Sequence, residues 1–212
     1  MPLATTLDTP VATTGRPVAW WALASSALLP TMLITAWVIA GARQAATYSP
    51  MRQTVSVLSG DAATDRWIVT GGLYAVGVAY FVTALGSRAL APATRTGLVL
   101  AGLAAIGVAS FPQPVHGTSQ VHVACTALGA VTIAVWPALA ARQESVLSAV
   151  GTRRTVAASL VSIALFMWMA FETRNGPVLG LAERTSSALQ SCWPFVVALA
   201  LRRAYQTSPV DR

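Results

Sequence analysis

Both histidines of the chain lie in one short stretch, within residues 111–125. His116 stands between two prolines and Gly117, and His122 follows after a polar turn. Imidazole is a frequent metal ligand and a general base near neutral pH. Two histidines this close together in a chain with no others indicate a divalent-metal site or an acid–base site. The alternative is that both are interfacial residues hydrogen-bonded to loop backbone.

A second group of polar residues recurs at helical spacing near the end of the chain. Glu183 and Ser187 are followed by Gln190 or Ser191, at intervals that place them on one face of a helix. A polar stripe against lipid would be costly, so we expect this face to lie against other helices or a wet cavity. The simpler interpretation is that Glu183 only stabilises a helix N-terminus.

Four other residues would complete a site with these groups. Arg184 could bind an anionic headgroup, or it could simply extend to the membrane interface. Glu172 lies in the connection before it, and Tyr48 and Asp61 lie in the long segment 42–66. We therefore expect a polar site with His116, His122 and Glu183 as catalytic residues, and with these four as substrate-binding residues. The two histidines are also the candidate metal ligands.

The composition places these residues in a membrane protein. Of the 212 residues, 55% are hydrophobic and only 10% are charged, whereas a soluble domain has about 25% charged residues. Apolar stretches long enough to span a bilayer occur at about 18–41, 67–86, 96–111, 121–141, 155–171 and 185–201. The fold class is therefore an all-α bundle of six transmembrane helices in one domain, 17–203. Residues 1–16 are expected to form a disordered cytoplasmic tail, and 204–212 a second cytoplasmic tail.

The arginines predict the orientation of these spans. If the N-terminus is inside, nine arginines are inner and five are outer: Arg16, Arg88, Arg95, Arg142, Arg153, Arg154, Arg202, Arg203 and Arg212 against Arg43, Arg52, Arg66, Arg174 and Arg184. By the positive-inside rule, both chain ends face the cytoplasm, and the polar site opens outward. We expect a multi-pass protein of the plasma membrane. The net charge of +7 then indicates contact with membrane lipids rather than nucleic acid. The protein could form homo- or hetero-oligomers.

The connection between the first two spans, residues 42–66, is long enough to have structure of its own. Ser49 and Pro50 are typical of a helix start and Gly60 of a helix end. Met51, Val55 and Leu58 would then share one apolar face, which predicts a short amphipathic helix at the outer mouth of the bundle. Asp65 is expected to cap the second span. The inner connection 142–154 is expected to be a solvated loop.

Residue types that are rare or absent limit the cofactors that this chain could bind. The sequence contains no lysine, which excludes a retinal or pyridoxal Schiff base. Cys125 and Cys192 both lie in apolar segments, without metal-binding spacing, and are expected to be buried and unpaired. A divalent metal at the histidines is therefore the one cofactor that the sequence suggests.

Several short motifs resemble those of a prokaryotic membrane family catalogued as domain of unknown function 998. The motifs are Tyr48-x-Pro50, Thr54-Val-Ser56-Val-Leu58-Ser59, Trp67, Gly71, Gly107, Phe111-Pro112, His122, Gly180-Leu-Ala-Glu183-Arg184 and Trp193. Where many relatives have an acid after the Phe-Pro pair, this chain has Gln113. The resemblance extends from Val18 to Arg203 and implies a six-helix fold without implying an activity.

Three functions are compatible with these observations. The first is a membrane-embedded enzyme that acts on a lipid-like or small substrate at the outer leaflet, with a histidine as general base or metal ligand. The second is a small-solute transporter or channel, although the spans contain no charged residue near mid-membrane. The third is a non-catalytic accessory subunit. We expect His122 and Glu183 to lie close together if the site is functional.

Overall fold

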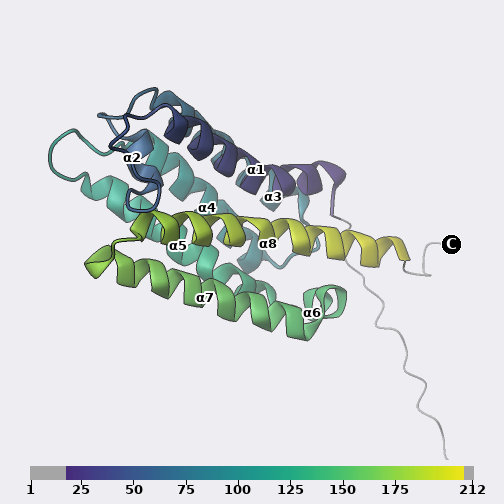
Figure 1. Ribbon diagram of the computed structural model, residues 1–212. Coiled ribbons are helices and arrows are strands. Elements are labelled where there is room, and N and C mark those ends of the chain that lie inside the picture. Colours follow the sequence, from purple (N-terminus) through teal and green to yellow (C-terminus); the bar gives the residue numbers. More distant parts are fainter. Residues whose placement is uncertain (1–17, 208–212) are drawn as a thin grey trace, which may run out of the picture.

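The computed structural model describes residues 18–207, and the regular structure in this range is all helical (Figure 1). The long helices are α1 (Trp20–Ala42), α3 (Trp67–Gly86), α4 (Pro92–Ser110), α5 (Gln120–Ala140), α7 (Thr152–Asn175) and α8 (Leu179–Thr207). Two short helices, α2 (Val55–Ser59) and α6 (Glu144–Val150), lie in the connections. The all-α prediction is confirmed for the described residues. The predicted disordered tail 1–16 lies outside them.

Five of the described helices are long and apolar enough to cross a membrane, which supports the multi-pass prediction. They are α1, α3, α4, α5 and most of α7, as Thr152–Arg174. α8 is not among them, because Glu183, Arg184 and the polar stripe beyond them dilute its apolar residues. The predicted sixth span, 185–201, lies within this longer helix. α8 also continues to Thr207, so the first residues of the predicted tail 204–212 are helical, and 208–212 lie outside the description.

The inner connection 142–154 is more ordered than the sequence predicts. We expected a solvated loop, but residues Glu144–Val150 form α6. Val146 and Val150 are buried, and α6 packs against α7 and α8. The pair of apolar residues at i and i+4 provides the reason, since it gives this segment one face to bury.

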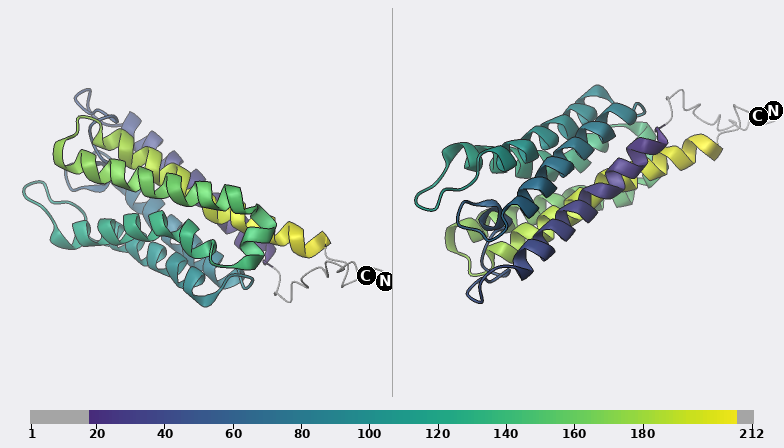
Figure 2. Two further views of the ribbon diagram at one scale, coloured as in Figure 1. Left: turned by 90° about the horizontal axis from the view of Figure 1, so that it is seen from below. Right: turned by 90° about the horizontal axis from the view of Figure 1, so that it is seen from above.

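The six long helices form a closed ring. Each packs against the next in the order α1, α3, α4, α5, α7 and α8, and α8 packs against α1. The start of α1 and the end of α8 lie at one end of the bundle, and α2 lies at the opposite end (Figure 2). The arrangement leaves room on the ring axis for an internal cavity.

Glycines allow two of these helices to approach closely. A Cβ added at Gly77 of α3 would lie 2.9 Å from the carbonyl oxygen of Gly102 in α4, and one added at Gly102 would lie 2.8 Å from that of Gly77. Backbones this close leave no room for side chains. These glycines therefore serve close helix packing.

Apolar clusters pack both ends of the ring. One cluster includes Val18, Leu98 and Trp136 and lies toward the end where α1 begins. The other includes Trp37 of α1, and Leu58 of α2, at the opposite end. Residues of both clusters line the cavity, among them Val76 and Trp37.

Candidate functional site

The segment 43–66 folds into one end of the bundle rather than lying over it. Val55 and Leu58 are buried as predicted, and α2 ends before Gly60 as predicted. The predicted start at Ser49 is wrong, because residues 49–53 form a separate turn and α2 begins at Val55. Met51 is 46% exposed. The backbone carbonyls of this turn face α8, where Leu181 N donates to Met51 O at 3.0 Å.

A hydrogen bond connects α2 to His122 at the start of α5. The Nε2 atom of His122 lies 2.9 Å from Ser56 Oγ, and the Nδ1 atom lies 2.8 Å from the carbonyl oxygen of Phe111. The imidazole is 1% exposed. Its place in the first turn of α5 is fixed by Ser119, whose hydroxyl accepts from His122 N at 3.3 Å.

These partners define which nitrogen of the neutral imidazole carries the proton. A backbone carbonyl only accepts hydrogen bonds, so Nδ1 carries the proton and donates to Phe111 O. Nε2 is then an acceptor, and it accepts from the hydroxyl of Ser56. A serine hydroxyl that donates to an imidazole, which is itself oriented by a third group, is the arrangement that activates a nucleophilic serine.

Glu183 binds the residue next to Ser56. Its Oε2 accepts from Val55 N at 2.7 Å, so the carboxylate receives the first N–H group of α2. His122 and Glu183 therefore contact consecutive residues of one short helix. These two residues, which come from different long helices, are thus connected through α2.

Arg184 binds the turn before α2. Its Nη1 donates to the carbonyl oxygens of Pro50 at 2.8 Å and Gln53 at 2.7 Å, and Nη2 donates to the hydroxyl of Tyr48. Gly180 makes this approach possible, because a Cβ there would lie 2.3 Å from Gln53 O. Burial raises the pKa of Tyr48, against the opposing effect of the Arg184 charge. Arg184 and Tyr48 thus hold the segment 43–66 rather than presenting free groups to a headgroup.

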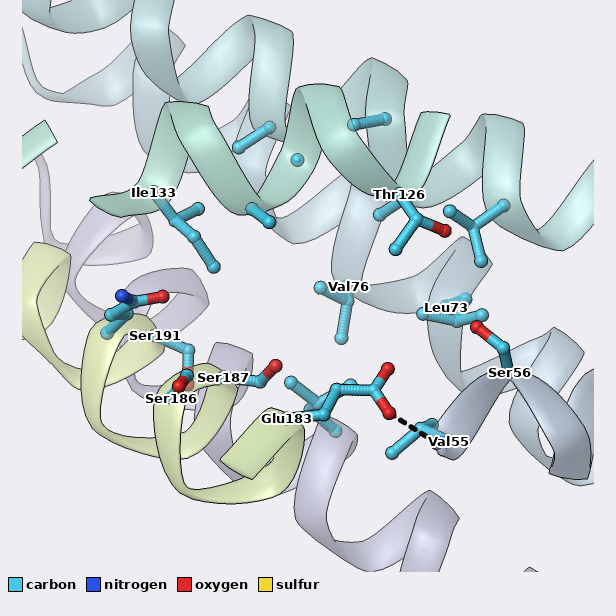
Figure 3. A pocket seen from close by; sticks show the side chains of 18 of the residues that line it. Val55, Ser56, Leu73, Val76, Thr126, Ile133, Glu183, Ser186, Ser187 and Ser191 are labelled. Atoms are coloured by element: carbon cyan, nitrogen blue, oxygen red, sulfur yellow. Dashed lines mark hydrogen bonds between the residues drawn. The ribbon is translucent and has the colours of Figure 1, made fainter. Parts of the chain in front are cut away.

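An internal cavity of about 130 Å³ lies beneath α2. Val55 and Ser56 form part of its wall at that end, and most of its lining is apolar. Figure 3 shows the Glu183 carboxylate reaching toward this space, with one oxygen bonded to Val55. Ser56 therefore lies at the boundary between the imidazole and the cavity.

The polar stripe of α8 faces this cavity. Glu183, Ser187, Gln190 and Ser191 all line it, as the helical spacing predicts. Gln190 Nε2 also donates to Ser162 O of α7 at 2.9 Å. The stripe therefore lies against the cavity and the neighbouring helix α7.

The other predicted site residues lie elsewhere. Glu172 is buried where α7 meets α8, and its carboxylate accepts from Val178 N at 3.1 Å and from Trp168 Nε1 at 3.3 Å. It stabilises the turn that leads into α8. Asp61 forms an ion pair with Arg66, and His116 is exposed in the 111–119 connection. None of these three lines the cavity among the described residues.

Asp65 does not cap α3 in the predicted way. The N-cap residue is Arg66, without a side-chain cap hydrogen bond, and Asp65 has a φ of 51°. Its carboxylate pairs with Arg43 at the end of α1. This hydrogen bond with Arg43 holds the pKa of Asp65 below its usual value.

The metal hypothesis gains no geometric support. In the described part of the chain, no three His, Cys, Asp or Glu residues lie together as metal ligands would. A metal at His122 would have to displace Ser56 or Phe111 from the ring nitrogens. Cys125 and Cys192 are free as expected. Neither is buried as expected, since Cys125 is half-buried and Cys192 is exposed.

Sequence reasoning missed Ser56 and Thr126 as site residues. Ser56 lies in the Thr54–Ser59 motif, but no sequence spacing relates it to His122, 66 residues away. Thr126 follows His122 at i+4 and lines the cavity. Ser56 could have been found only by pairing segments that are distant in the chain, whereas the helical spacing already placed Thr126 on the same face as His122.

The fold defines a multi-pass α-helical membrane protein. A family model described as "Protein of unknown function (DUF998)" matches residues 12–200, and the chain belongs to this family. The resemblance drawn from the short motifs is confirmed. No curated protein and no solved structure matches the chain.

Proposed function

We propose that this protein is a membrane-embedded enzyme that transfers or hydrolyses the acyl group of a lipid-like or small ester. Ser56 is the nucleophile and His122 is its general base. The hydrogen bond of 2.9 Å from Ser56 Oγ to His122 Nε2 carries the proposal. Its distance lies within the range of about 2.6–3.2 Å that joins a nucleophile to its base.

In each half of the reaction, one acyl–oxygen bond forms, another breaks, and one proton moves by way of His122. The Ser56 oxygen attacks the carbonyl carbon of the ester while the hydroxyl proton passes to His122 Nε2. The bond from that carbon to the leaving oxygen then breaks, the leaving alcohol takes the proton from Nε2, and an acyl-Ser56 ester remains. Attack by water, or by an acceptor alcohol, repeats these steps and regenerates the Ser56 hydroxyl.

The other groups position this pair. The carbonyl of Phe111 keeps the Nδ1 proton in place, so that Nε2 can accept. Glu183 binds Val55 N and thereby fixes α2, one residue before Ser56. Arg184 holds the preceding turn. Glu183 and Arg184 thus serve the site as positioning residues.

For this function, we propose that the protein crosses the membrane six times and has both chain ends in the cytoplasm. α8 is the sixth span, and its polar stripe is tolerated because it faces the cavity rather than lipid. The excess of inner arginines orients the α2 end toward the outer face of the plasma membrane. Substrate would then reach Ser56 from the outer leaflet, with the segment 43–66 acting as the cover of the site.

Hydrolysis of p-nitrophenyl butyrate by the protein in phosphatidylcholine nanodiscs tests this function. Ser56→Ala should abolish the enzyme-dependent rate. His122→Gln keeps a hydrogen-bonding side chain but loses the base, and should lower kcat by about 10²–10⁴-fold. Ser59→Ala is the matched control on the same helix, because its hydroxyl bonds only to Ser56 O, and it should retain the wild-type rate.

Thermal unfolding of each variant separates loss of catalysis from loss of fold. A folded Ser56→Ala protein with the wild-type rate would overturn the assignment of the nucleophile. A wild-type protein without activity toward any ester, together with His122→Gln unfolding at a lower temperature, would favour the accessory-subunit function, in which His122 only fixes α2.

A further inference from the structure

Several polar groups on the cavity wall have hydrogen-bonding capacity that the protein does not use. Glu183 Oε2 accepts from Val55 N, but no hydrogen bond to Oε1 is recorded in the described range. The hydroxyl of Thr126, on the facing helix α5, is buried without a partner among the described residues. Ser187 lies one helical turn from Glu183 and lines the same cavity. These groups surround a space that is otherwise apolar.

The carboxylate of Glu183 also lacks a counter-charge in direct contact. The ion pairs within residues 18–207 are Arg43 with Asp65 and Arg66 with Asp61. The adjacent guanidinium of Arg184 donates to backbone carbonyls and Tyr48 instead. A carboxylate in an apolar space is stabilised by a cation that also donates hydrogen bonds to it.

The volume of the cavity indicates the size of a ligand that fits inside it. An apolar protein cavity of about 150 Å³ holds benzene, which has six non-hydrogen atoms. A space of about 130 Å³ therefore holds a chain of about five or six non-hydrogen atoms. The apolar walls from α3, α4 and α5, among them Val76, Ala104 and Ile133, suit a hydrocarbon portion.

We infer that the cavity binds a short carbon chain that ends in an ammonium group. The ammonium N–H groups donate to Glu183 Oε1 and Ser187 Oγ, and the carbon chain lies against the apolar wall. One part of this inference rests on the proposed function, namely that the bound chain belongs to the ester that Ser56 attacks. The same chemistry occurs in an amino-acyl ester and in an ethanolamine headgroup.

Isothermal titration of the protein in phosphatidylcholine nanodiscs tests this inference with n-butylammonium and 1-butanol. The two probes have the same size and differ in charge. We expect n-butylammonium to bind with a Kd about tenfold lower than that of 1-butanol, since charge-assisted hydrogen bonds are about twice as strong as neutral ones. Displacement by ethanolamine or by alanine ethyl ester would then distinguish the two sources, and either displacement supports the site.

Glu183→Gln should remove the preference for the ammonium probe, because its amide oxygen still accepts from Val55 N but has no charge. Glu172→Gln is the matched control, since Glu172 is a buried carboxylate away from the cavity, and it should keep the preference. Ala130→Leu, which fills part of the cavity, should weaken the binding of both probes. Equal Kd values for the two probes in the wild type, or a preference retained in Glu183→Gln, would overturn the inference.

The Ser56→Ala variant separates this inference from the proposed function. It should bind n-butylammonium as the wild type does, because Ser56 is not among the groups that hold the ammonium. Binding without any Ser56-dependent ester hydrolysis would reject the enzyme and keep the binding site. Hydrolysis without a preference for n-butylammonium would reject the binding site and keep the enzyme.

Discussion

Ser56 and His122 are 66 residues apart in the sequence, yet their side chains share a hydrogen bond of 2.9 Å at the edge of the internal cavity. The serine belongs to the short helix α2 and the histidine to the first turn of α5. Because Phe111 O receives the Nδ1 proton, the Nε2 lone pair is directed to the Ser56 hydroxyl. We propose that this pair has a chemical function beyond holding α2 in place.

Arg184 should control how firmly the segment 43–66 is held. Arg184→Gln removes charged donors from Pro50 O and Gln53 O, and a hydrogen bond to a charged group contributes about 2 kcal/mol. We expect amide hydrogen exchange of residues 55–58 to become about 30-fold faster. Arg52→Gln is the control, since Arg52 is exposed. Unchanged exchange in Arg184→Gln would show that other contacts hold this segment.

The orientation of the bundle can be tested by cysteine labelling in cells. In a Cys125→Ala, Cys192→Ser background, we expect an impermeant maleimide to label Thr118→Cys, in the 111–119 connection. Ser148→Cys in α6 should react only after the cells are permeabilised, because we expect the arginine-rich end to face the cytoplasm. Both positions are exposed. Labelling of Ser148→Cys in intact cells would reverse the topology.

The Arg43–Asp65 ion pair should make the stability depend on pH. The pKa of Asp65 is lowered in the folded protein by its hydrogen bond with Arg43, so the contribution of this pair is present above the unfolded pKa of about 3.9. It is lost as the pH falls through the lower folded pKa. Asp65→Asn removes it without straining the positive φ of 51°, which asparagine tolerates.

We therefore expect Asp65→Asn to unfold at a lower temperature than the wild type at pH 7, and the difference to shrink as the pH falls below about 4. The effect should be small, because the pair is exposed to solvent. A difference that grows toward acidic pH would contradict the assigned direction of the pKa shift.

The long helices were predictable because each follows from local sequence. Apolar stretches of the sequence indicate α1, α3, α4, α5 and α7 within a few residues. The stripe Glu183, Ser187 and Gln190 on one helical face predicted the wall that now lines the cavity. Periodicity within one helix requires no knowledge of the other helices.

Contacts between distant segments were not predictable in the same way. Glu172 and Glu183 look alike in the sequence, but one binds the turn before α8 and the other reaches α2. Met51 shares the spacing of Val55 and Leu58, yet it lies in a separate turn before α2 and is exposed. Such outcomes depend on which helices close the ring, and a single sequence does not contain that pairing.

Labelling with a fluorophosphonate followed by peptide mass spectrometry tests the central claim most directly. Only a serine activated by a base reacts readily with this reagent. We predict phosphonylation of Ser56 in the wild type and in Ser59→Ala, and none at Ser56 in His122→Gln at equal fold stability. Phosphonylation of Ser56 at the same rate in His122→Gln, or no labelling of Ser56 in active wild-type protein, would contradict the Ser56–His122 assignment.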